Sequence, residues 1–421
     1  MTIELIIAAI LAFNVAWSMG ANDVANAMGT AIGSRVLTLG QALAIAGILE
    51  FAGAVLLSQR VVRRLATSVT NTEQFAAEPE VLLLGMVAVL LASGLWIQLA
   101  TRWGLPVSST HAIVGAIAGF NLVAAGATSL NWLALGQLAL AWVLTPVLGC
   151  ILAGAVYGAL RSGILQQANP LRYWQESCPW LAVLVIGVFG AGVAPQFREF
   201  SGDLSIALPP PTLMLLVGFG AIGILTKLGL KPTPPEVTRQ PIEARFGRFQ
   251  VVSSSFVAFA HGANDVGNAI APFAVVVAIV QSGAVPTAEL PVPLWLLLAG
   301  GVAIILGLAI QGQNVITTIG SEITPLQPSS GFCAELATAA TVLLAASLGF
   351  PVSTSHALVG SLWGIRWVNR DADNADAAET KSGAQVLGKI VSAWALTVPI
   401  ALVLGAASYW ALASLAQLGW F

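Results

Sequence analysis

An eight-residue stretch occurs twice in this chain and organises the rest of the sequence around it. The first copy is Gly20-Ala-Asn-Asp-Val-Ala-Asn-Ala27 and the second is Gly262-Ala-Asn-Asp-Val-Gly-Asn-Ala269, with seven identical residues at an offset of 242. Both copies lie within long apolar segments. An aspartate at the centre of a membrane helix costs about 2.5 to 3.5 kcal/mol on insertion scales. Polar residues that only join packed helices are the simpler explanation for one copy, but two nearly identical copies favour a functional site.

Two further motifs repeat in the same order. Pro106-Val-Ser-Ser-Thr-His111 recurs as Pro351-Val-Ser-Thr-Ser-His356 at an offset of 245, and Ala141-Trp-Val-Leu-Thr145 recurs as Ala393-Trp-Ala-Leu-Thr397 at an offset of 252. Kept order and spacing indicate an internal duplication, and many secondary transporters are built from such repeats around a site near the bilayer midplane. We therefore divide the chain into a first transmembrane repeat at 1–160, connecting helices with a basic linker at 161–248, and a second transmembrane repeat at 249–421.

The composition is that of a membrane protein. Of the 421 residues 57% are hydrophobic and 9% are charged, against about a quarter charged in ordinary soluble domains. The net charge of -2 with 17 Lys and Arg excludes a nucleic-acid binder, which needs a basic face. The fold predicted is an all-α polytopic membrane protein in the lipid bilayer, with two homologous repeats.

A helix needs about 20 apolar residues to cross the hydrocarbon core of a bilayer. Two apolar segments, 105–122 and 350–368, instead open with proline and a run of hydroxyl residues, which predicts broken or re-entrant helical hairpins. Whether each half has four or five full crossings stays open. The segments that meet the length criterion are 3–20, 36–58, 81–101, 132–160, 179–195, 211–228, 250–280, 293–320, 333–349 and 385–418.

A proline-rich basic stretch separates the two halves. It begins with Lys231-Pro-Thr-Pro-Pro-Glu236 and continues with Arg239, Arg245 and Arg248. Loops rich in Lys and Arg tend to stay in the cytoplasm. We expect this linker to be cytoplasmic, and the cluster of Arg60, Arg63 and Arg64 to lie on the same side.

The aspartate motifs predict cation sites. On a helix, residues three or four apart share one face, so each aspartate lies beside the amides of its own copy. Carboxylate and amide oxygens without a thiolate suit a small hard cation such as Na+ or H+, and we favour Na+ at both the Asp23 and Asp265 clusters. The residues in these clusters are Asn22, Asp23, Asn26, Asn264, Asp265 and Asn268.

The hydroxyl motifs predict an anion site. Proline suits the first turn of a helix, serine and threonine are preferred caps, and helix N-termini bind phosphate or sulfate. Two such ends facing each other would form a cradle free of Lys and Arg, from which an anion could be released. Alternatively, these hydroxyls only bond back to their own helices. The residues are Ser108, Ser109, Thr110, Ser353, Thr354 and Ser355.

Five more titratable residues lie in or beside these apolar stretches. Two are the glutamates Glu50 and Glu335, which we predict to act in cation binding or coupling because carboxylates are rare in membrane helices. The three histidines of the chain, His111, His261 and His356, all lie at the motifs, where a proton-transfer or a structural role is open. The sequence has no P-loop and no protease or lipase motif, so we expect neither ATP-driven transport nor an enzyme.

Together, these motifs and Ser329-Ser-Gly-Phe-Cys-Ala-Glu-Leu336 resemble those of the inorganic phosphate transporter (PiT) family over roughly residues 5 to 415. The resemblance implies a symporter of inorganic phosphate with Na+ or H+, built from two inverted repeats that share a central site, with no cofactor. It further implies a homodimer in the plasma (inner) membrane. The central loop of this sequence is short, as in prokaryotic members of the family. The family's functional acids fall on Asp23, Asp265, Glu50 and Glu335.

Three other functions remain open. Some members of this family carry sulfate, so a sulfate symporter of the same fold is the nearest alternative. An anion channel would use the same hydroxyl ends but would pass anions without a cation gradient. A receptor would bind its ligand without any flux.

Overall fold

The computed structural model describes residues 2–103, 107–203, 211–231, 241–286, 290–322, 327–369 and 377–417, with side chains described except at 2, 198–203, 211–215, 313–322 and 377–391. Pro106 and most of the basic linker, at 232–240, therefore lie outside the described residues. Helices make up nearly all of the described chain, and the one β-bridge there joins Thr70 to Leu130.

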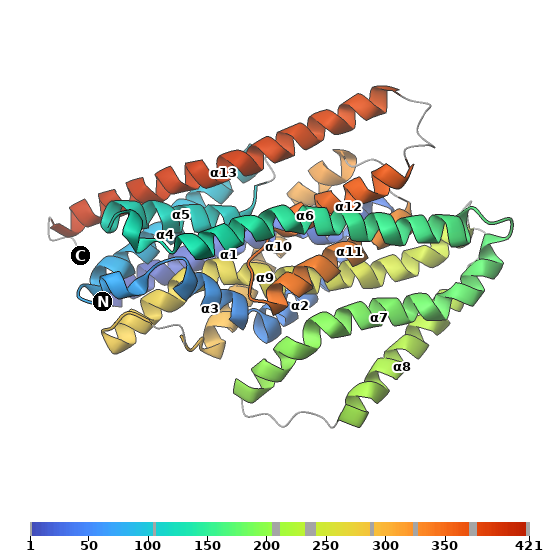
Figure 1. Cartoon of the computed structure of the whole chain (residues 1–421), viewed down its shortest axis with the longest axis horizontal. Helices are drawn as coiled ribbons and strands as arrows, with labels where there is room; N and C mark the ends of the chain where they lie inside the picture. Colours follow the sequence, from blue (N-terminus) through green and yellow to red (C-terminus); the bar gives the residue numbers. More distant parts are fainter. Residues whose placement is uncertain are drawn as a thin grey trace.

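The helices run mostly along the long axis of the molecule (Figure 1). Nine segments of the described chain are long and apolar enough to cross a bilayer, which agrees with the predicted polytopic membrane fold. The helices are α1 (Thr2–Gly33), α2 (Leu39–Leu57), α3 (Gln59–Ser68), α4 (Pro79–Arg102), α5 (Ser109–Ala124), α6 (Trp132–Leu160), α7 (Pro170–Asp203), α8 (Pro211–Leu230), α9 (Pro241–Ser282), α10 (Leu294–Glu322), α11 (Pro328–Ser347), α12 (Thr354–Asn369) and α13 (Ala377–Gln417).

The two hydroxyl motifs begin short helices, as their caps predict. The helices α5 and α12 have 16 residues each, which is about 24 Å at 1.5 Å per residue and less than the roughly 30 Å of a bilayer core. Ser108 Oγ accepts a hydrogen bond from the His111 N–H at 3.3 Å, and Ser353 Oγ accepts one from the His356 N–H at 3.4 Å. Each helix therefore starts inside the protein at a serine cap.

The two halves of the sequence are intertwined. Helix α1 packs most extensively on α10 and α2 on α9, while α5 packs on α13 and α6 on α12. Glycines allow the backbones to touch: a Cβ at Gly20 would lie 2.1 Å from the Ile304 carbonyl oxygen, and one at Gly307 would lie 2.0 Å from that of Trp17. Neither half forms a separate body, and the predicted boundary at 248/249 falls within α9.

The arginine cluster of α3 does not lie on the side of the linker, so that expectation is wrong. Arg63 Nε donates to the Leu290 carbonyl oxygen at 3.2 Å, beyond the C-terminal end of α9, whereas the linker precedes the N-terminal end of this 42-residue helix. Protein contacts hold these guanidinium groups: Arg60 Nη1 donates to Ser347 O at 2.5 Å, and Arg64 lies 3.7 Å from the Phe350 ring centroid. The charge rule fails here because it describes loops rather than side chains packed on protein.

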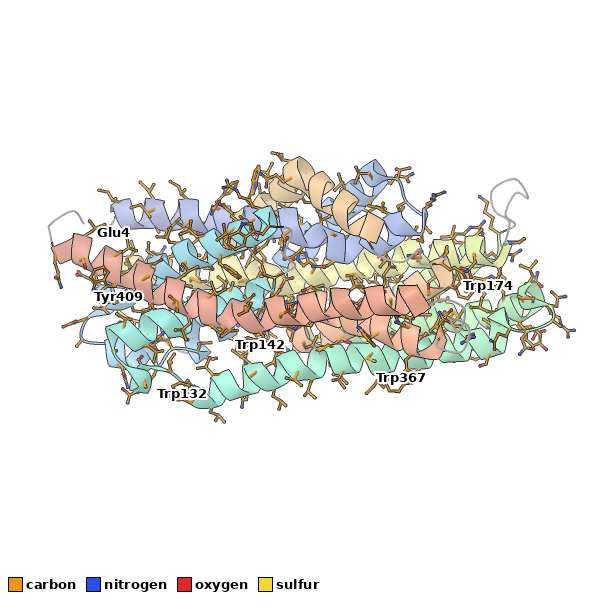
Figure 2. The ribbon with its side chains drawn as sticks, turned by 90° about the horizontal axis from the view of Figure 1, so that it is seen from above. Glu4, Trp132, Trp142, Trp174, Trp367 and Tyr409 are labelled. Atoms are coloured by element: carbon orange, nitrogen blue, oxygen red, sulfur yellow. The ribbon has the colours of Figure 1, made fainter. Side chains whose placement is uncertain are left out.

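Aromatic side chains mark both ends of the molecule. Trp132 and Tyr409 lie toward one end, and Trp174 and Trp367 toward the other (Figure 2). Trp132 is 61% exposed and Trp367 is 70% exposed, which is typical of tryptophans at the two membrane interfaces. Trp142 lies about midway between these ends, so the hydroxyl motif that contains His111 lies near the middle of the molecule.

Candidate functional site

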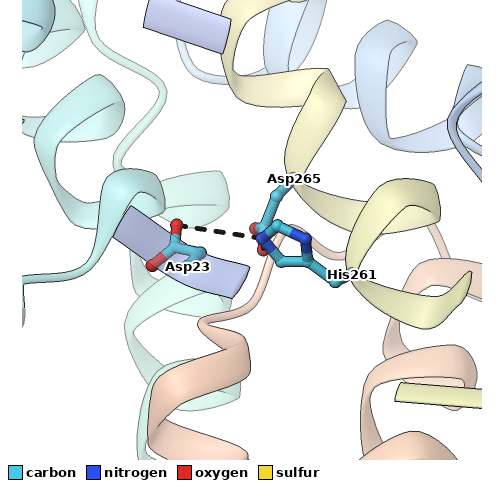
Figure 3. Close-up of side chains that lie close together, drawn as sticks. All are labelled: Asp23, His261 and Asp265. Atoms are coloured by element: carbon cyan, nitrogen blue, oxygen red, sulfur yellow. Dashed lines mark ion pairs between the residues drawn. The ribbon is translucent and has the colours of Figure 1, made fainter. Parts of the chain in front are cut away.

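Asp23 and Asp265 lie on either side of one histidine. His261 Nε2 is 2.9 Å from Asp265 Oδ2 and 3.8 Å from Asp23 Oδ2 (Figure 3). All three side chains are buried. Helices α1 and α9 thus bring the two copies of the aspartate motif together inside the protein, away from lipid.

The asparagines of each motif bind one oxygen of their own aspartate. Asp23 Oδ1 accepts from Asn22 Nδ2 at 3.2 Å and from Asn26 Nδ2 at 3.1 Å. Asp265 Oδ1 accepts from Asn264 Nδ2 at 2.8 Å and, more weakly, from Asn268 Nδ2 at 3.4 Å. The amides therefore orient each carboxylate and leave its second oxygen toward the centre.

The N-terminal ends of α5 and α12 carry the serines and threonines of the hydroxyl motifs, and we call them the hydroxyl ends. Both contact α9. Thr354 Oγ1 donates to Asp265 Oδ2 at 3.0 Å, and Asn268 Nδ2 lies within hydrogen-bond distance of Ser109 Oγ at 3.2 Å and Thr110 Oγ1 at 3.1 Å. The α12 end also touches the α5 end, since Thr110 Oγ1 donates to the Val352 carbonyl oxygen at 3.2 Å. The α12 set thus contacts an aspartate, and the α5 set contacts an asparagine of the same aspartate motif.

A small pocket unites the two motifs. The space that they enclose is narrow, and in this structure it has no room for a water molecule. Carboxylates form one part of its wall, and hydroxyls at the N-termini of two helices form the other. The lining residues are Asp23, Asn26, Val107, Ser108, Ser109, Asp265, Ser353, Thr354 and Ser355.

The oxygen atoms beside this pocket can hold a small cation. One carboxylate oxygen each of Asp23 and Asp265 and one ring nitrogen of His261 lie within 4.8 Å of one another. Asn268 Oδ1 is buried and has no hydrogen-bond donor among the described residues. A buried carbonyl oxygen without a donor costs about 1 to 3 kcal/mol, and a cation would satisfy it. Hard oxygens of this kind suit Na+.

Glu50 lies behind His261. Its Oε1 is 3.2 Å from His261 Nδ1, and neither carboxylate oxygen meets hydrogen-bond criteria with any other described residue. Helices α2 and α9 touch here, because a Cβ at Gly262 would lie 1.9 Å from the Glu50 carbonyl oxygen. Glu50 therefore reaches the aspartates only through His261, a bridge that the sequence did not predict.

Glu335 forms a separate buried cluster that does not line the pocket. Its carboxylate accepts hydrogen bonds from Thr30, from Ser253 Oγ at 2.6 Å and from Gln250 Nε2 at 3.3 Å. We did not single out these three donors from the sequence. Residue spacing could have indicated two of them. Thr30 follows Asp23 by seven residues and Ser253 precedes His261 by eight, and each spacing places the pair on one helix face.

The other two histidines lie behind the hydroxyl ends. His111 and His356 contact each other with ring centroids 4.7 Å apart. Neither lines the pocket. Of the three histidines, only His261 touches the aspartates.

Comparison with known proteins identifies the family. A model of the phosphate transporter family matches residues 19–405. The chain belongs to the phosphate transporter family. It is 36% identical to a relative from Thermococcus kodakarensis, provisionally named a phosphate permease, with 96% of each chain covered. It is also 36% identical to the chloroplastic inorganic phosphate transporter 2-1 of Arabidopsis thaliana, covering 94% of this chain and 70% of that one.

A solved structure has the same fold. It is described as the sodium-dependent phosphate transporter, and it matches with a TM-score of 0.83 at 36% identity, covering 98% of this chain and 99% of that one. This phosphate transporter family member is thus a multi-pass membrane transporter and not an enzyme, as the sequence predicted, and the transported ions are its substrates. Its relatives come from archaea, bacteria and a plant, so family membership alone does not indicate a prokaryotic source.

Proposed function

We propose that the chain is a symporter that moves inorganic phosphate with Na+ through the pocket between α1, α5, α9 and α12. The observation that carries the proposal is that carboxylates and hydroxyl-capped helix ends line the same buried pocket. One set of groups suits a cation and the other an anion. In support, the similar solved structure is described as sodium-dependent.

Charge explains why the two solutes would bind together. Phosphate entering beside Asp23 and Asp265 meets two carboxylates, and like charges 4 Å apart repel by about 4 kcal/mol at an effective dielectric constant of 20. Cations at the aspartates remove this repulsion. The hydroxyls and N–H groups at the starts of α5 and α12 then bind the anion at the positive ends of two helix dipoles. Occupation by both solutes is therefore favoured over occupation by phosphate alone.

The aspartates also favour phosphate over sulfate. Phosphate retains at least one O–H group at neutral pH, and this group can donate to a carboxylate oxygen such as Asp265 Oδ2. Sulfate has no such donor, and a site that pairs buried hydrogen-bonding groups rejects an analogue that lacks one of them. The pocket thus has a means to discriminate between two anions of similar shape.

The remaining assignments complete the proposal. The transporter would work as a homodimer in the plasma (inner) membrane of a prokaryotic cell, with repeats at 1–160 and 249–421 joined by 161–248. Asn22, Asn26, Asn264 and Asn268 would complete the cation sites, and Glu50 and Glu335 would take part in coupling. Proton coupling is the alternative for the driving ion.

The test is uptake of radiolabelled phosphate into liposomes that contain the purified protein, with Na+ and pH gradients imposed separately. We expect an inward Na+ gradient to accelerate uptake at least tenfold and a pH gradient alone to leave it nearly unchanged. Unlabelled sulfate should compete poorly. Equal uptake without any cation gradient would instead indicate a channel, and uptake driven only by the pH gradient would refute Na+ coupling.

A further inference from the structure

Four aromatic rings from the repeated motifs meet behind the hydroxyl ends. The Trp142 ring centroid lies 4.0 Å from that of His111, and the Trp394 centroid lies 3.6 Å from that of His356. The two imidazoles are 4.7 Å apart in an edge-to-face arrangement. Each half of the sequence supplies one tryptophan and one histidine, so the cluster crosses from one repeat to the other.

The rings of this four-ring cluster pack on one another and do not line the pocket. His111 is 6% exposed and His356 is 3% exposed. Among the described residues, Nε2 of His356 has no hydrogen-bond partner, and neither histidine lines the pocket. The edge-to-face contact packs the edge of one imidazole against the face of the other.

The cluster is tied to the chain that enters α12. Trp142 Nε1, on α6, donates to the Pro351 carbonyl oxygen at 3.3 Å, two residues before the Ser353 cap. On the other side, His111 follows directly after Thr110, which donates to the Val352 carbonyl oxygen at 3.2 Å. The rings therefore connect the first turn of α5 with the residues that lead into α12. They hold Pro351 and Val352, just before the Ser353 cap, in place.

We propose that Trp142, His111, His356 and Trp394 are positioning residues that set the separation and orientation of the two hydroxyl ends that hold phosphate. The proposal rests on the proposed function, in which Ser108–Thr110 and Ser353–Ser355 bind the anion. Binding groups must be held within about 0.5 Å of their productive geometry. Four packed rings supply that rigidity, while the hydroxyls themselves lie at the ends of helices that begin inside the protein.

The first test compares two tryptophans that make the same kind of hydrogen bond. Trp142→Phe keeps a ring but removes the N–H donated to Pro351, and Trp132→Phe removes an N–H donated to the Ala127 carbonyl oxygen at 2.9 Å on the exposed end of α6. Losing one partly buried hydrogen bond corresponds to a roughly two- to twelvefold change. We expect the phosphate concentration for half-maximal uptake to rise by that factor in Trp142→Phe with the maximal rate within twofold of wild type, and Trp132→Phe to match wild type.

The second test separates ring packing from proton transfer. His111→Ala removes the ring, whereas His111→Phe keeps a ring and removes both nitrogens; the same pair is made at His356. We expect the alanine variants to raise the half-maximal phosphate concentration more than tenfold and the phenylalanine variants to restore it to within threefold of wild type. A melting temperature in detergent checks that each variant folds.

Three outcomes would overturn the proposal. These are equal phosphate affinities for Trp142→Phe and Trp132→Phe, phenylalanine variants as impaired as the alanine variants, or a lost maximal rate with unchanged affinity. The last two would indicate that the imidazole nitrogens carry a proton. If the wild-type protein itself takes up no phosphate, the proposed function fails instead, so the two failures are distinguishable.

Discussion

Asn264 and Val352 are joined by two hydrogen bonds that clamp the entrance of α12 to α9. Asn264 Nδ2 donates to the Val352 carbonyl oxygen at 2.5 Å, and the Val352 N–H donates to Asn264 Oδ1 at 3.2 Å. The first-half counterpart behaves differently. Asn22 donates to Asp23 at 3.2 Å and accepts from Thr101 at 3.4 Å. Among the described residues, no hydrogen bond joins Asn22 to Val107. In that part of the chain, the first asparagine of the motif therefore binds the residue before the serine cap in the second half and not in the first.

This asymmetry predicts unequal stability effects at two equivalent positions. Asn264→Leu leaves the buried Val352 N–H unpaired and leaves its carbonyl oxygen with only the bond from Thr110 Oγ1, which should destabilise the protein by about 1 to 3 kcal/mol. Asn22→Leu removes no backbone contact and should cost less. Melting temperatures of the two variants in the same detergent measure the difference. Equal decreases in melting temperature would show that the two hydrogen bonds between Asn264 and Val352 do not stabilise the protein.

The aspartates should be essential for coupled uptake. Asp23→Asn and Asp265→Asn keep side-chain size but remove the charge that attracts the cation, so we expect Na+-driven phosphate uptake to fall at least a hundredfold, equal to about 2.7 kcal/mol. The exposed Glu73 provides a matched control, since Glu73→Gln removes one carboxylate far from the pocket. Wild-type uptake rates in either aspartate variant would refute their role.

Glu50 and His261 should act as one unit, whereas Glu335 should act independently. Glu50 reaches the aspartates through His261 at 3.2 Å, while Glu335 is bound by Thr30, Ser253 and Gln250. In double-mutant cycles of Na+-driven uptake, Glu50→Gln and His261→Gln should be non-additive by at least about 1 kcal/mol, and Glu50→Gln with Glu335→Gln should be additive within about 0.5 kcal/mol. Additive effects in the first pair would contradict the bridge.

Close backbone contact at Gly262 should make this glycine irreplaceable. A methyl group there would lie 1.9 Å from the Glu50 carbonyl oxygen, whereas one at Gly29 of α1 would meet no atom within 4 Å. Gly262→Ala must push α2 away from α9, and we expect a large loss of folded protein in detergent. Gly29→Ala should be neutral or stabilise by up to about 1 kcal/mol through helix propensity. Similar melting temperatures for both variants would disprove the steric argument.

Removing one hydroxyl should weaken phosphate binding without removing the cation site. Thr354 Oγ1 donates to Asp265 at 3.0 Å and lines the pocket. Thr354→Val keeps the shape of the side chain, and losing one hydrogen bond should raise the half-maximal phosphate concentration about five- to tenfold. The exposed hydroxyl of Ser414 on α13 serves as the control in Ser414→Ala. A larger change in Na+ affinity than in phosphate affinity would place Thr354 in the cation site.

Local chemistry made much of the site predictable. Serine caps before α5 and α12 start those helices because side-chain oxygens bind N–H groups only three residues away. The spacing of each Asn-Asp-x-x-Asn motif places its polar atoms on one helix face for the same local reason. These features, the doubled motifs and the apolar composition depend on neighbours in the sequence, and the family resemblance confirmed here rests on them.

Contacts between distant helices were decided by the tertiary structure. Three such contacts join segments far apart in the sequence: the bridge from Asp23 through His261 to Glu50, the hydroxyl donors around Glu335, and the bond from Arg63 to Leu290. Which side chains meet there depends on how glycines such as Gly20 and Gly262 let backbones approach, and on the register of one helix against another. The sequence by itself determined the helices, their caps and the repeated motifs, while only packing determined which of those polar groups share a pocket.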